Sequence, residues 1–491
     1  MFEILNAAEM KLAEARATEQ GVSGFEMMTA AGVAAAETIA KTFKPRPVLV
    51  LCGPGNNGGD GFIVAQHLKK LGWPLRVACM VKRDALKGDA LLAAQQWDGE
   101  IEALDSNLSV HKTGLVVDAV FGTGFDMESG RALAPELALL FDKIRTRKIP
   151  VVAIDIPSGV DAATGAADPA ALKARLTATF CRKKYGHVLL PGKSLCGAVS
   201  VIDIGITDET IAALETHCFE NAPALWLKHF PRPNAESHKY TRGHALVYGG
   251  AKRTGAACLA AAAAQKTGAG LVTIAAPEKA WAVYSGYRAS LMVDECDDIE
   301  TWKALLRDER KNAVLLGCGA GTDERLRDAV NATLSINKSG VLDADVFTVF
   351  KDNPQELFAK LSPQYVLTPH EGEFEKLFGA LEGSKTGRAL KAAETAGAII
   401  LLKGADTVIA APDGSTVINT GAPPTLATAG SGDVLAGMIA GLIAQGMPPF
   451  MAACAAVWLH GAAAKAYGPG LTAEDVISHI SQTLKLLFKR P

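Results

Sequence analysis

The sequence has no excess of either charge, few aromatic residues and no closely paired cysteines. Lys and Arg number 50 among 491 residues against 52 Asp and Glu, so the formal net charge is −2, which argues against a protein that coats nucleic acid. Nine scattered cysteines without a C-x-x-C pair disfavour a zinc site or a disulfide framework. With 49% hydrophobic residues, we expect roughly two to three domains in a reducing cytoplasm.

One stretch without charged residues needs a separate test for membrane insertion. Residues 434–464 contain no Asp, Glu, Lys or Arg and exceed the roughly 20 residues that cross a bilayer. The sequence Q-G-M-P-P at residues 445–449 interrupts the stretch, so it predicts two buried helices instead. Residues 1–16 carry three Glu and no signal-peptide pattern, so we expect no membrane partner.

Apolar strand segments alternate with helical segments in two separate series. The first series has strands at residues 48–52, 75–80, 115–120 and 151–156, a helix over 60–71, and two helices within 9–41. The second has strands at 245–248, 271–275, 313–316, 365–368 and 399–402, with helices near 255–266, 322–334, 371–378 and 385–396. Such alternation predicts α/β domains with parallel sheets. The proline-containing stretch 205–240 indicates a junction, which divides the chain into residues 1–219 and 220–491.

Polar and glycine residues follow three strands of the first series. G-P-G-N-N-G-G-D-G occupies residues 53–61, and Asp118 and Asp155 each close an apolar strand. Because the carboxyl ends of parallel strands meet at one edge of a sheet, this pattern predicts a phosphate or dinucleotide site. Oxygen atoms of Asn57, Asp118 and Ser158 would suit a cation that prefers oxygen ligands.

These motifs, with D-A-V-F-G-T-G at 118–124 and A-I-D-I-P-S-G at 153–159, resemble the NAD(P)HX epimerase domain, also called the YjeF N-terminal domain, over about residues 1–215. The resemblance implies a Rossmann-like sheet that interconverts the R and S forms of hydrated NADH and NADPH. It implies Asp155 as the acid/base group, partnered by Lys184 or by the adjacent Lys183, and K⁺ at Asn57, Asp118 and Ser158. The residues that it places around the hydrated cofactor are Asn56, Asn57, Gly58, Gly59, Asp60, Gly122, Thr123, Gly124, Phe125, Asp126, Met127, Glu128 and Asp155.

A second glycine-rich segment, T-A-G-S-G-D at residues 428–433, precedes the first of the two buried helices, which we expect to begin at Val434. The N–H groups of residues 430–432 would face an anion, and Asp433 could accept a proton from a hydroxyl that phosphate reaches. Two other strands run into T-P-H-E-G-E-F at 368–374 and K-G-A-D-T at 403–407. This arrangement predicts a nucleotide-phosphate site.

Together with Y-G-G-A-K-R-T-G-A at 248–256, T-G-A-G-L-V-T-I at 267–274 and G-C-G at 317–319, these motifs resemble the ribokinase-like superfamily, specifically the ADP-dependent NAD(P)HX dehydratase, over about residues 225–491. The resemblance implies that ADP phosphorylates the hydroxyl of the hydrated cofactor, with Mg²⁺ on the phosphates, and that loss of phosphate restores the double bond. It places the hydrated cofactor at Ala256, Gly319, His370 and the catalytic Asp433, and ADP at Lys403, Gly404, Ala405, Asp406, Thr407 and Gly432.

The combined hypothesis is a bifunctional repair enzyme, in which an epimerase (an isomerase) supplies the S form to a dehydratase (a lyase). The resemblance implies small-molecule substrates, namely NADHX, NADPHX and ADP, and a homo-oligomer. Two alternatives stay open. A small-molecule kinase of the ribokinase class would share G-S-G-D and release a stable phosphorylated product. The first domain could instead be a binding scaffold, like related domains in an mRNA-decapping scaffold, although its acidic residues and the neutral charge disfavour this.

Overall fold

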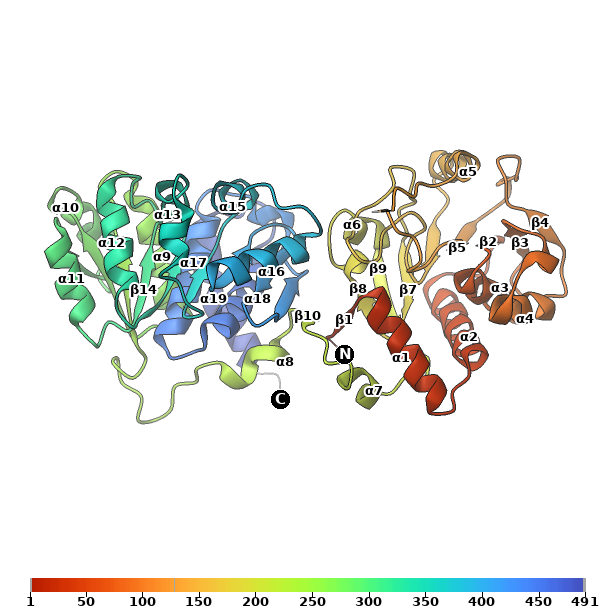
Figure 1. Cartoon of the computed structure of the whole chain (residues 1–491), viewed down its shortest axis with the longest axis horizontal. Coiled ribbons are helices and arrows are strands. Elements are labelled where there is room, and N and C mark those ends of the chain that lie inside the picture. Colours follow the sequence, from red (N-terminus) through yellow and green to blue (C-terminus); the bar gives the residue numbers. More distant parts are fainter. Residues whose placement is uncertain (1, 128, 489–491) are drawn as a thin grey trace. The chain divides into compact units, whose positions relative to one another are not determined.

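The computed structural model describes residues 2–127 and 129–488 (Figure 1). The chain forms two compact units that divide between Cys218 and Phe219, and each is described by itself. Unit 1 contains β1 (Ile4–Leu5), α1 (Ala7–Glu19), α2 (Gly24–Thr42), β2 (Val48–Cys52), α3 (Asn56–Lys70), β3 (Leu75–Cys79), α4 (Gly88–Gln96), β4 (Ile101–Ala103), β5 (Leu115–Ala119), α5 (Pro135–Thr146), β6 (Val151–Ile154), β7 (Leu176–Phe180), β8 (Lys183–Lys184), α6 (Gly192–Cys196), β9 (Ala198–Ile202) and α7 (Asp208–Ala212).

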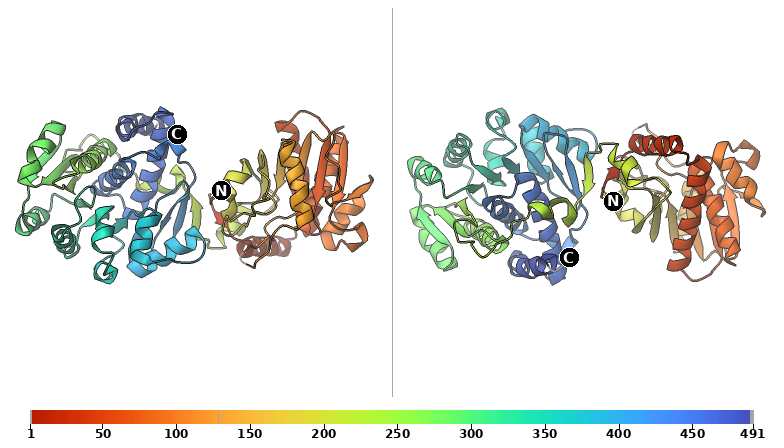
Figure 2. Two further views of the ribbon diagram at one scale, coloured as in Figure 1. Left: turned by 90° about the horizontal axis from the view of Figure 1, so that it is seen from above. Right: turned by 90° about the horizontal axis from the view of Figure 1, so that it is seen from below.

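Unit 1 is built on a seven-stranded parallel sheet in the order β4-β3-β2-β5-β6-β7-β9. In β2, Val48, Val50 and Cys52 pack with helices α1 to α4, whereas Leu49 and Leu51 pack with α5. Alternate residues of a strand point to opposite faces, so β2 is buried on both sides (Figure 2). Strand β3 lies on one side of β2 and β5 lies on the other, so the strand order reverses at β2. This reversal opens a crevice at the carboxyl ends of β2 and β5.

Unit 2 contains the remaining elements of the chain. These are β10 (Cys218–Glu220), α8 (Pro223–Trp226), β11 (His244–Tyr248), α9 (Thr254–Thr267), β12 (Leu271–Ala276), α10 (Glu278–Tyr287), β13 (Met292–Glu295), α11 (Ile299–Arg307), β14 (Ala313–Leu316), α12 (Glu324–Leu334), β15 (Ser339–Leu342), α13 (Asp345–Val349), α14 (Pro354–Phe358), β16 (Tyr365–Leu367), α15 (Glu371–Phe378), α16 (Lys385–Ala396), β17 (Ile399–Leu402), β18 (Thr407–Ala410), β19 (Thr416–Asn419), α17 (Ser431–Ala444), α18 (Pro449–Tyr467) and α19 (Ala473–Phe488).

The ten strands of unit 2 form one sheet in the order β10-β19-β18-β17-β16-β15-β14-β11-β12-β13. Strands β11 to β17 pair in parallel, and β17, β18 and β19 form antiparallel pairs. Strand β11 lies between β12 and β14, so a second crevice opens at the ends of β11 and β14. The short strands β15, β18 and β19 were not expected, because each begins with Ser or Thr and so has a weaker apolar pattern than β14 or β17.

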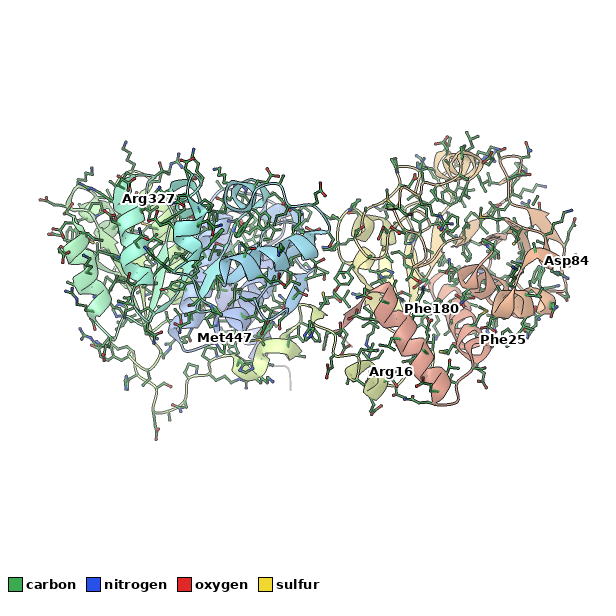
Figure 3. All side chains as sticks on the ribbon, in the orientation of Figure 1. Arg16, Phe25, Asp84, Phe180, Arg327 and Met447 are labelled. Carbon is green, nitrogen blue, oxygen red and sulfur yellow. The ribbon has the colours of Figure 1, made fainter. Side chains whose placement is uncertain are left out.

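The uncharged stretch of the sequence forms two buried helices, α17 and α18, as predicted. Met447 lies in the turn between them (Figure 3). Helix α17 packs closely on α9. A Cβ atom added at Gly437 would lie 2.0 Å from the carbonyl oxygen of Ala260, and one added at Gly441 would lie 2.5 Å from that of Ala264. Among the described helices, none combines the length and the apolar character that a bilayer crossing requires.

Two helices begin earlier than the sequence pattern indicates. Helix α3 starts at Asn56 rather than at residue 60, and α17 starts at Ser431 rather than Val434. Both first turns are rich in glycine, which lowers the helical signal. In α3, however, Gly58 permits a close approach, since a Cβ atom there would lie 1.9 Å from the carbonyl oxygen of Gly53. Asp433 therefore lies in the first turn of α17, and Asp60 is the fifth residue of α3.

Candidate active sites

Asp155 follows β6 directly and occupies a backbone conformation that non-glycine residues seldom adopt. Its φ angle is 62°, and such a conformation costs on the order of 1–3 kcal/mol. The surrounding chain holds it in place: the Asp155 N–H donates to the carbonyl of Ala178 at 2.7 Å. His187 Nδ1 accepts the N–H of Lys184 at 2.9 Å, so Nε2 carries the proton and donates to the carbonyl of Asp155 at 2.7 Å.

Lys184 forms a buried ion pair with Asp155. Its Nζ lies 2.9 Å from Asp155 Oδ1 and donates to Thr179 Oγ1 and to the carbonyl of Phe180, both at 3.0 Å. Phe180 is the last residue of β7 (Figure 3), and Lys184 is 1% exposed. Burial by itself would raise the pKa of Asp155, but the Lys184 ammonium, His187 and the Thr179 hydroxyl together lower it. The carboxylate is therefore ionised, and of the two candidate lysines it is Lys184 that forms the pair.

The N-terminal strand holds this lysine in position. Strand β1 pairs in parallel with β8, with Ile4 opposite Lys183 and Leu5 opposite Lys184. Arg182 adds an ion pair to Glu3 at 2.8 Å. Neither strand was expected, because two-residue strands separated by most of the domain leave no pattern in the sequence.

The second oxygen of Asp155 faces the two glycine-rich loops. A Cβ atom at Gly122 would lie 3.1 Å from Asp155 Oδ2 and 3.3 Å from Asn57 Oδ1. Both polar atoms of the Asn57 side chain are buried and have no hydrogen-bond partner among the described residues. Since an unpaired buried amide costs about 1–3 kcal/mol, the geometry indicates that a ligand satisfies it.

Asp118 and Ser158 form a buried pair at the same sheet edge. Ser158 donates its hydroxyl to Asp118 Oδ1 at 2.5 Å and its N–H to Oδ2 at 2.9 Å. Burial raises the pKa of Asp118, although the hydrogen bonds from Ser158 oppose the shift. Asp118, Ser158 and Asn57 carry the carboxylate, hydroxyl and amide oxygens that a hard cation prefers, and of these only the Asn57 amide has no partner among the described residues.

The other residues predicted to contact the cofactor in unit 1 differ in accessibility. Asn56, Gly124 and Asp126 are exposed, Thr123 and Met127 are half-buried, and Gly58, Gly59 and Asp60 are buried. Phe125 is 1% exposed and packs in the core with α5, so only its backbone can reach a ligand. Glu128 lies outside the described residues.

In unit 2, Asp433 lies beside a second carboxylate. Ligand atoms of Asp433, Asp343 and Cys318 all lie within 4.8 Å of one another. Burial and the neighbouring Asp343 raise the pKa of Asp433 to about 6. This side chain can thus exchange a proton near neutral pH, as a general base must.

Lys403 places a positive charge next to this pair. Its Nζ lies 3.0 Å from Asp343 Oδ1 and 3.7 Å from Glu373 Oε2. Burial would lower the pKa of Lys403, but the carboxylates raise it overall. A Cβ atom at Gly432 would lie 3.5 Å from Nζ, so the ammonium stands at the N-terminus of α17. A cation beside the N-terminus of a helix is an arrangement that binds phosphate.

Asp343 and Cys318 were missed by the sequence analysis. Asp343 is 2% exposed and follows the short strand β15, where it also accepts the hydroxyl of Thr368 at 2.7 Å. The signal for it was V-L-D-A-D at residues 341–345, the same order of apolar residues and acid that identified Asp118 and Asp155. Cys318 lies between two of the glycines already singled out.

A cavity of about 660 Å³ lies at the crevice between β11 and β14. Its lining includes Tyr248, Gly250, Arg253, Trp302, Gly319 and Asp345. Ala256 adjoins Gly319, since a Cβ atom at Gly319 would lie 3.0 Å from the Ala256 methyl group. Ala256 and Gly319, which were both predicted to bind the hydrated cofactor, are therefore adjacent. Cys318 precedes Gly319 in the chain, and its thiol lies beside Asp433.

The remaining predicted residues of unit 2 lie on two further strand ends. His370 caps α15 by accepting the N–H of Glu373 at 3.3 Å, and its side chain is 60% exposed. In the loop 403–407, Asp406 pairs with Lys385 at 2.7 Å. The Thr407 hydroxyl donates to the carbonyl of Gly404 at 2.7 Å, and this hydrogen bond closes the turn of residues 404–407.

The folds and sites define a class of protein that joins a Rossmann-like unit to a ribokinase-like unit, each with an acidic residue at a sheet edge. Residues 24–186 match the model of the YjeF-related protein N-terminus, and residues 245–485 match that of NAD(P)H-hydrate dehydratase. A solved ribokinase-like superfamily protein from Enterococcus faecalis is 23% identical, with a TM-score of 0.50 over 55% of this chain and 96% of that chain, and supports the fold alone.

Full-length relatives identify the family. The bifunctional NAD(P)H-hydrate repair enzyme of Moorella thermoacetica is 36% identical over 94% of this chain and 91% of its own length. That of Escherichia coli is 32% identical over 94% and 90%. The chain therefore belongs to the family of bifunctional NAD(P)H-hydrate repair enzymes, which confirms the predicted α/β fold class and the predicted function.

Proposed function

We propose that unit 1 epimerises the R and S forms of NADHX and NADPHX, and that unit 2 dehydrates the S form to NADH or NADPH at the expense of ADP, giving AMP and phosphate. The observation that supports this division is the pair of sheet-edge carboxylates with different surroundings. Asp155 is ionised beside a buried lysine, whereas Asp433 stands beside an anion-binding helix end.

In unit 1, the role proposed for Asp155 is to move a proton at the hydroxylated ring. Oδ1 is occupied by Lys184 and Thr179, which leaves Oδ2 for the substrate. Gly122, in the loop after β5, lies close to this oxygen and to the Asn57 side chain. The proposed roles of these residues are therefore to orient the hydrated ring over a fixed base.

In unit 2, Asp433 is proposed to accept the proton of the substrate hydroxyl while ADP transfers its terminal phosphoryl group to that oxygen. Hydroxide is a poor leaving group, whereas phosphate departs readily with the electrons of the carbon–oxygen bond. The adjacent ring carbon then loses a proton, and the electrons of that carbon–hydrogen bond complete the double bond. Lys403 and the N–H groups at the start of α17 would carry the charge of the phosphates. The cavity beside Gly319 has room for the rest of the substrate.

Two cations belong to the proposal. Asn57, Asp118 and Ser158 would hold K⁺, which is supported by the unpaired Asn57 amide and the buried Asp118 carboxylate. Asp343 offers the carboxylate oxygens that Mg²⁺ prefers, although the neighbouring Cys318 thiol does not suit it. Bound Mg²⁺ would neutralise the phosphates of ADP. We also expect a cytoplasmic homo-oligomer, on the resemblance alone.

The test is to incubate the full chain with both NADHX epimers, Mg²⁺ and either ADP or ATP, and to follow the absorbance of returning NADH. Complete recovery with ADP is expected. Recovery that stalls when one epimer is exhausted, apart from slow spontaneous exchange, would leave unit 1 as a binding scaffold. No NADH with either nucleotide, together with a stable phosphorylated product from another substrate, would favour the small-molecule kinase.

A further inference from the structure

Lys385 supports the loop of residues 403–407, which the sequence predicts to bind ADP. Its side chain is 12% exposed, and its Nζ lies 2.7 Å from Asp406 Oδ1. The same ammonium donates to the carbonyl of Lys403 at 3.4 Å. Lys385 therefore contacts both the first and the fourth residue of the loop and fixes the distance between them.

Gly404, the second residue of the loop, allows this close approach. A Cβ atom added at Gly404 would lie 2.3 Å from Lys385 Nζ, so any other residue there would displace the ammonium. The N–H and the carbonyl of Gly404 are both bonded to the Thr407 hydroxyl, at 3.2 and 2.7 Å. Thr407 thus closes the turn, and Lys385 holds the acceptor groups of Lys403 and Asp406.

The position of Lys385 in its own helix is electrostatically unfavourable. It is the first residue of α16, directly after the cap Ser384, and the first turn of this helix contains no acidic residue. The N-terminus of a helix carries a partial positive charge, which repels an ammonium group. The carboxylates of Asp406 and Glu371, the latter at 3.9 Å, offset this repulsion. The contacts with the loop and with α15, rather than the helix itself, therefore keep the ammonium in place.

A second ion pair anchors Glu371, the first residue of α15. Arg388, three residues beyond Lys385 on α16, donates to both carboxylate oxygens of Glu371, at 2.8 and 3.1 Å. The chain of contacts from Arg388 to Glu371, Lys385 and Asp406 joins two helices to the loop. Because Lys385 cannot reach a nucleotide without breaking these contacts, its effect on ADP must pass through the loop.

We propose that Lys385 is a positioning residue for ADP, which acts through the conformation and charge of the loop of residues 403–407. The proposal rests on the function proposed for unit 2. Lys385 binds two acceptors of the loop that would repel the phosphates, namely the Lys403 carbonyl and the Asp406 carboxylate. The Lys403 ammonium then remains as the charge that the loop presents to ADP at the start of α17.

The principal variant is Lys385→Met in the full chain, assayed by the ADP-dependent return of NADH from the S form. We expect KM for ADP to rise about tenfold, as for loss of one hydrogen bond to a charged group. The kcat and the KM for the S form should stay within about threefold of wild type, because a contact that stabilises bound ADP and the transition state equally changes KM alone. Titration calorimetry with ADP and Mg²⁺, without the hydrated cofactor, should show the same loss of affinity.

Lys391→Met is the matched control. Lys391 lies on the same helix, but its side chain is 67% exposed and pairs with Glu394 at 3.9 Å. Its replacement removes the same charge at a distance from the loop, so KM for ADP should match that of the wild type.

Two further variants distinguish a positioning role from a merely structural one. Lys385→Arg keeps a positive charge with N–H donors, and it should restore KM for ADP to within about threefold of wild type. Adding Asp406→Asn to Lys385→Met removes the carboxylate left without its partner, so the double variant should bind ADP more tightly than Lys385→Met. Lys385→Gln, which keeps a donor without the charge, should raise KM for ADP at least about threefold and serves if Lys385→Met does not fold.

Three results would overturn the assignment. These are an unchanged KM for ADP in Lys385→Met or Lys385→Gln, an equal rise in KM for the S form, and a double variant that binds ADP no better than Lys385→Met. A wild-type chain that forms no NADH in response to ADP would instead contradict the function proposed for unit 2.

Discussion

The two units use the same part of an α/β fold and give the key carboxylate opposite surroundings. Each places an acid at the carboxyl edge of a parallel sheet, close to a helix with glycine in its first turn. Asp155 lies against the ammonium of Lys184, and Asp433 lies against the carboxylate of Asp343. Accordingly, the pKa of Asp155 is lowered and that of Asp433 is raised to about 6.

The two carboxylates therefore affect the stability of their units in different ways. In unit 1 the ion pair contributes to the fold, because neither charge can remain buried without the other. In unit 2 the repulsion between Asp343 and Asp433 opposes ionisation of Asp433 and is relieved when a proton arrives. Removing one charged partner should therefore have opposite effects on the stability of the two units.

The largest effect is expected for Lys184→Met, which leaves Asp155 buried without its counter-charge. Breaking a buried pair in this way costs about 3–5 kcal/mol, so the unfolding transition of unit 1 should move to a much lower temperature and epimerisation should be lost. Differential scanning calorimetry with separate assays of the two reactions measures this. Dehydration of the S form should persist, because Asp433 belongs to the other unit.

Lys183→Met is the matched control, since it removes the same charge one residue away. Lys183 is half-buried, whereas Lys184 is buried, and we expect its effect on the unfolding temperature to be several times smaller. Equal losses from the two substitutions would mean that net charge, rather than the Asp155 contact, stabilises unit 1.

Asp433→Asn tests the same comparison in unit 2. We expect ADP-dependent return of NADH to fall by a factor of roughly 10²–10⁴, as for loss of a general base, while epimerisation continues. Because the raised pKa means that the ionised form is destabilised in the folded state, the unfolding temperature of unit 2 at pH 8 should stay the same or rise. Retained dehydration would remove Asp433 from the reaction, and a large loss of stability would contradict the assigned repulsion.

The sequence identified those parts of the two sites that follow long apolar strands or lie in glycine-rich motifs. Asp118, Asp155 and Asp433 belong to this group, because a buried strand or helix next to each acid has a clear pattern. Asp343 follows a strand as short as the one before Asp155, but this strand begins with Ser339 and Gly340, which weakens its apolar pattern. The sheet order and the ten-stranded extent of unit 2 also depend on pairings that no local pattern specifies.

The choice between Lys183 and Lys184 shows the same limit on a smaller scale. Two adjacent lysines are equivalent in sequence, and only the pairing of Leu5 with Lys184 turns one of them towards Asp155. Most of the sequence of unit 1 separates residues 4–5 from residues 183–184, which they contact. Tertiary pairing rather than local preference therefore decides which side chain is in the site.

A smaller effect, on acid stability, is expected from His187. Burial, and then the charge of Lys184, lowers the pKa of His187 to about 4 from an ordinary value of 6.5, so the unfolded chain binds this proton first as the pH falls. The stability that the neutral ring provides is present above pH 6.5 and is lost between 6.5 and about 4, to a total of roughly 3 kcal/mol. Unfolding of unit 1 by urea at pH 7 and pH 5 should show a smaller pH difference in His187→Gln than in the wild type.

The exposed His111 offers the matched control in the same unit. His111→Gln should leave the pH dependence of unit 1 unchanged, because the His111 ring is already exposed in the folded chain. If His187→Gln and His111→Gln gave the same difference between pH 7 and pH 5, the burial of His187 beside Lys184 would not be the source of the acid sensitivity.

The smallest effect is expected from the proposed K⁺ site, which unit 2 does not share. An ion that binds only the folded state stabilises it by about 1.4 kcal/mol at tenfold above its Kd, so replacing Na⁺ by K⁺ at constant ionic strength should raise the unfolding temperature of unit 1 alone. Asn57→Ala should abolish the increase by removing one oxygen ligand and the unpaired amide. Asn56→Ala, at the exposed neighbouring position, should keep it. Equal protection of wild type and Asn57→Ala would show that K⁺ binds elsewhere, and protection of both units would show a general effect of the salt.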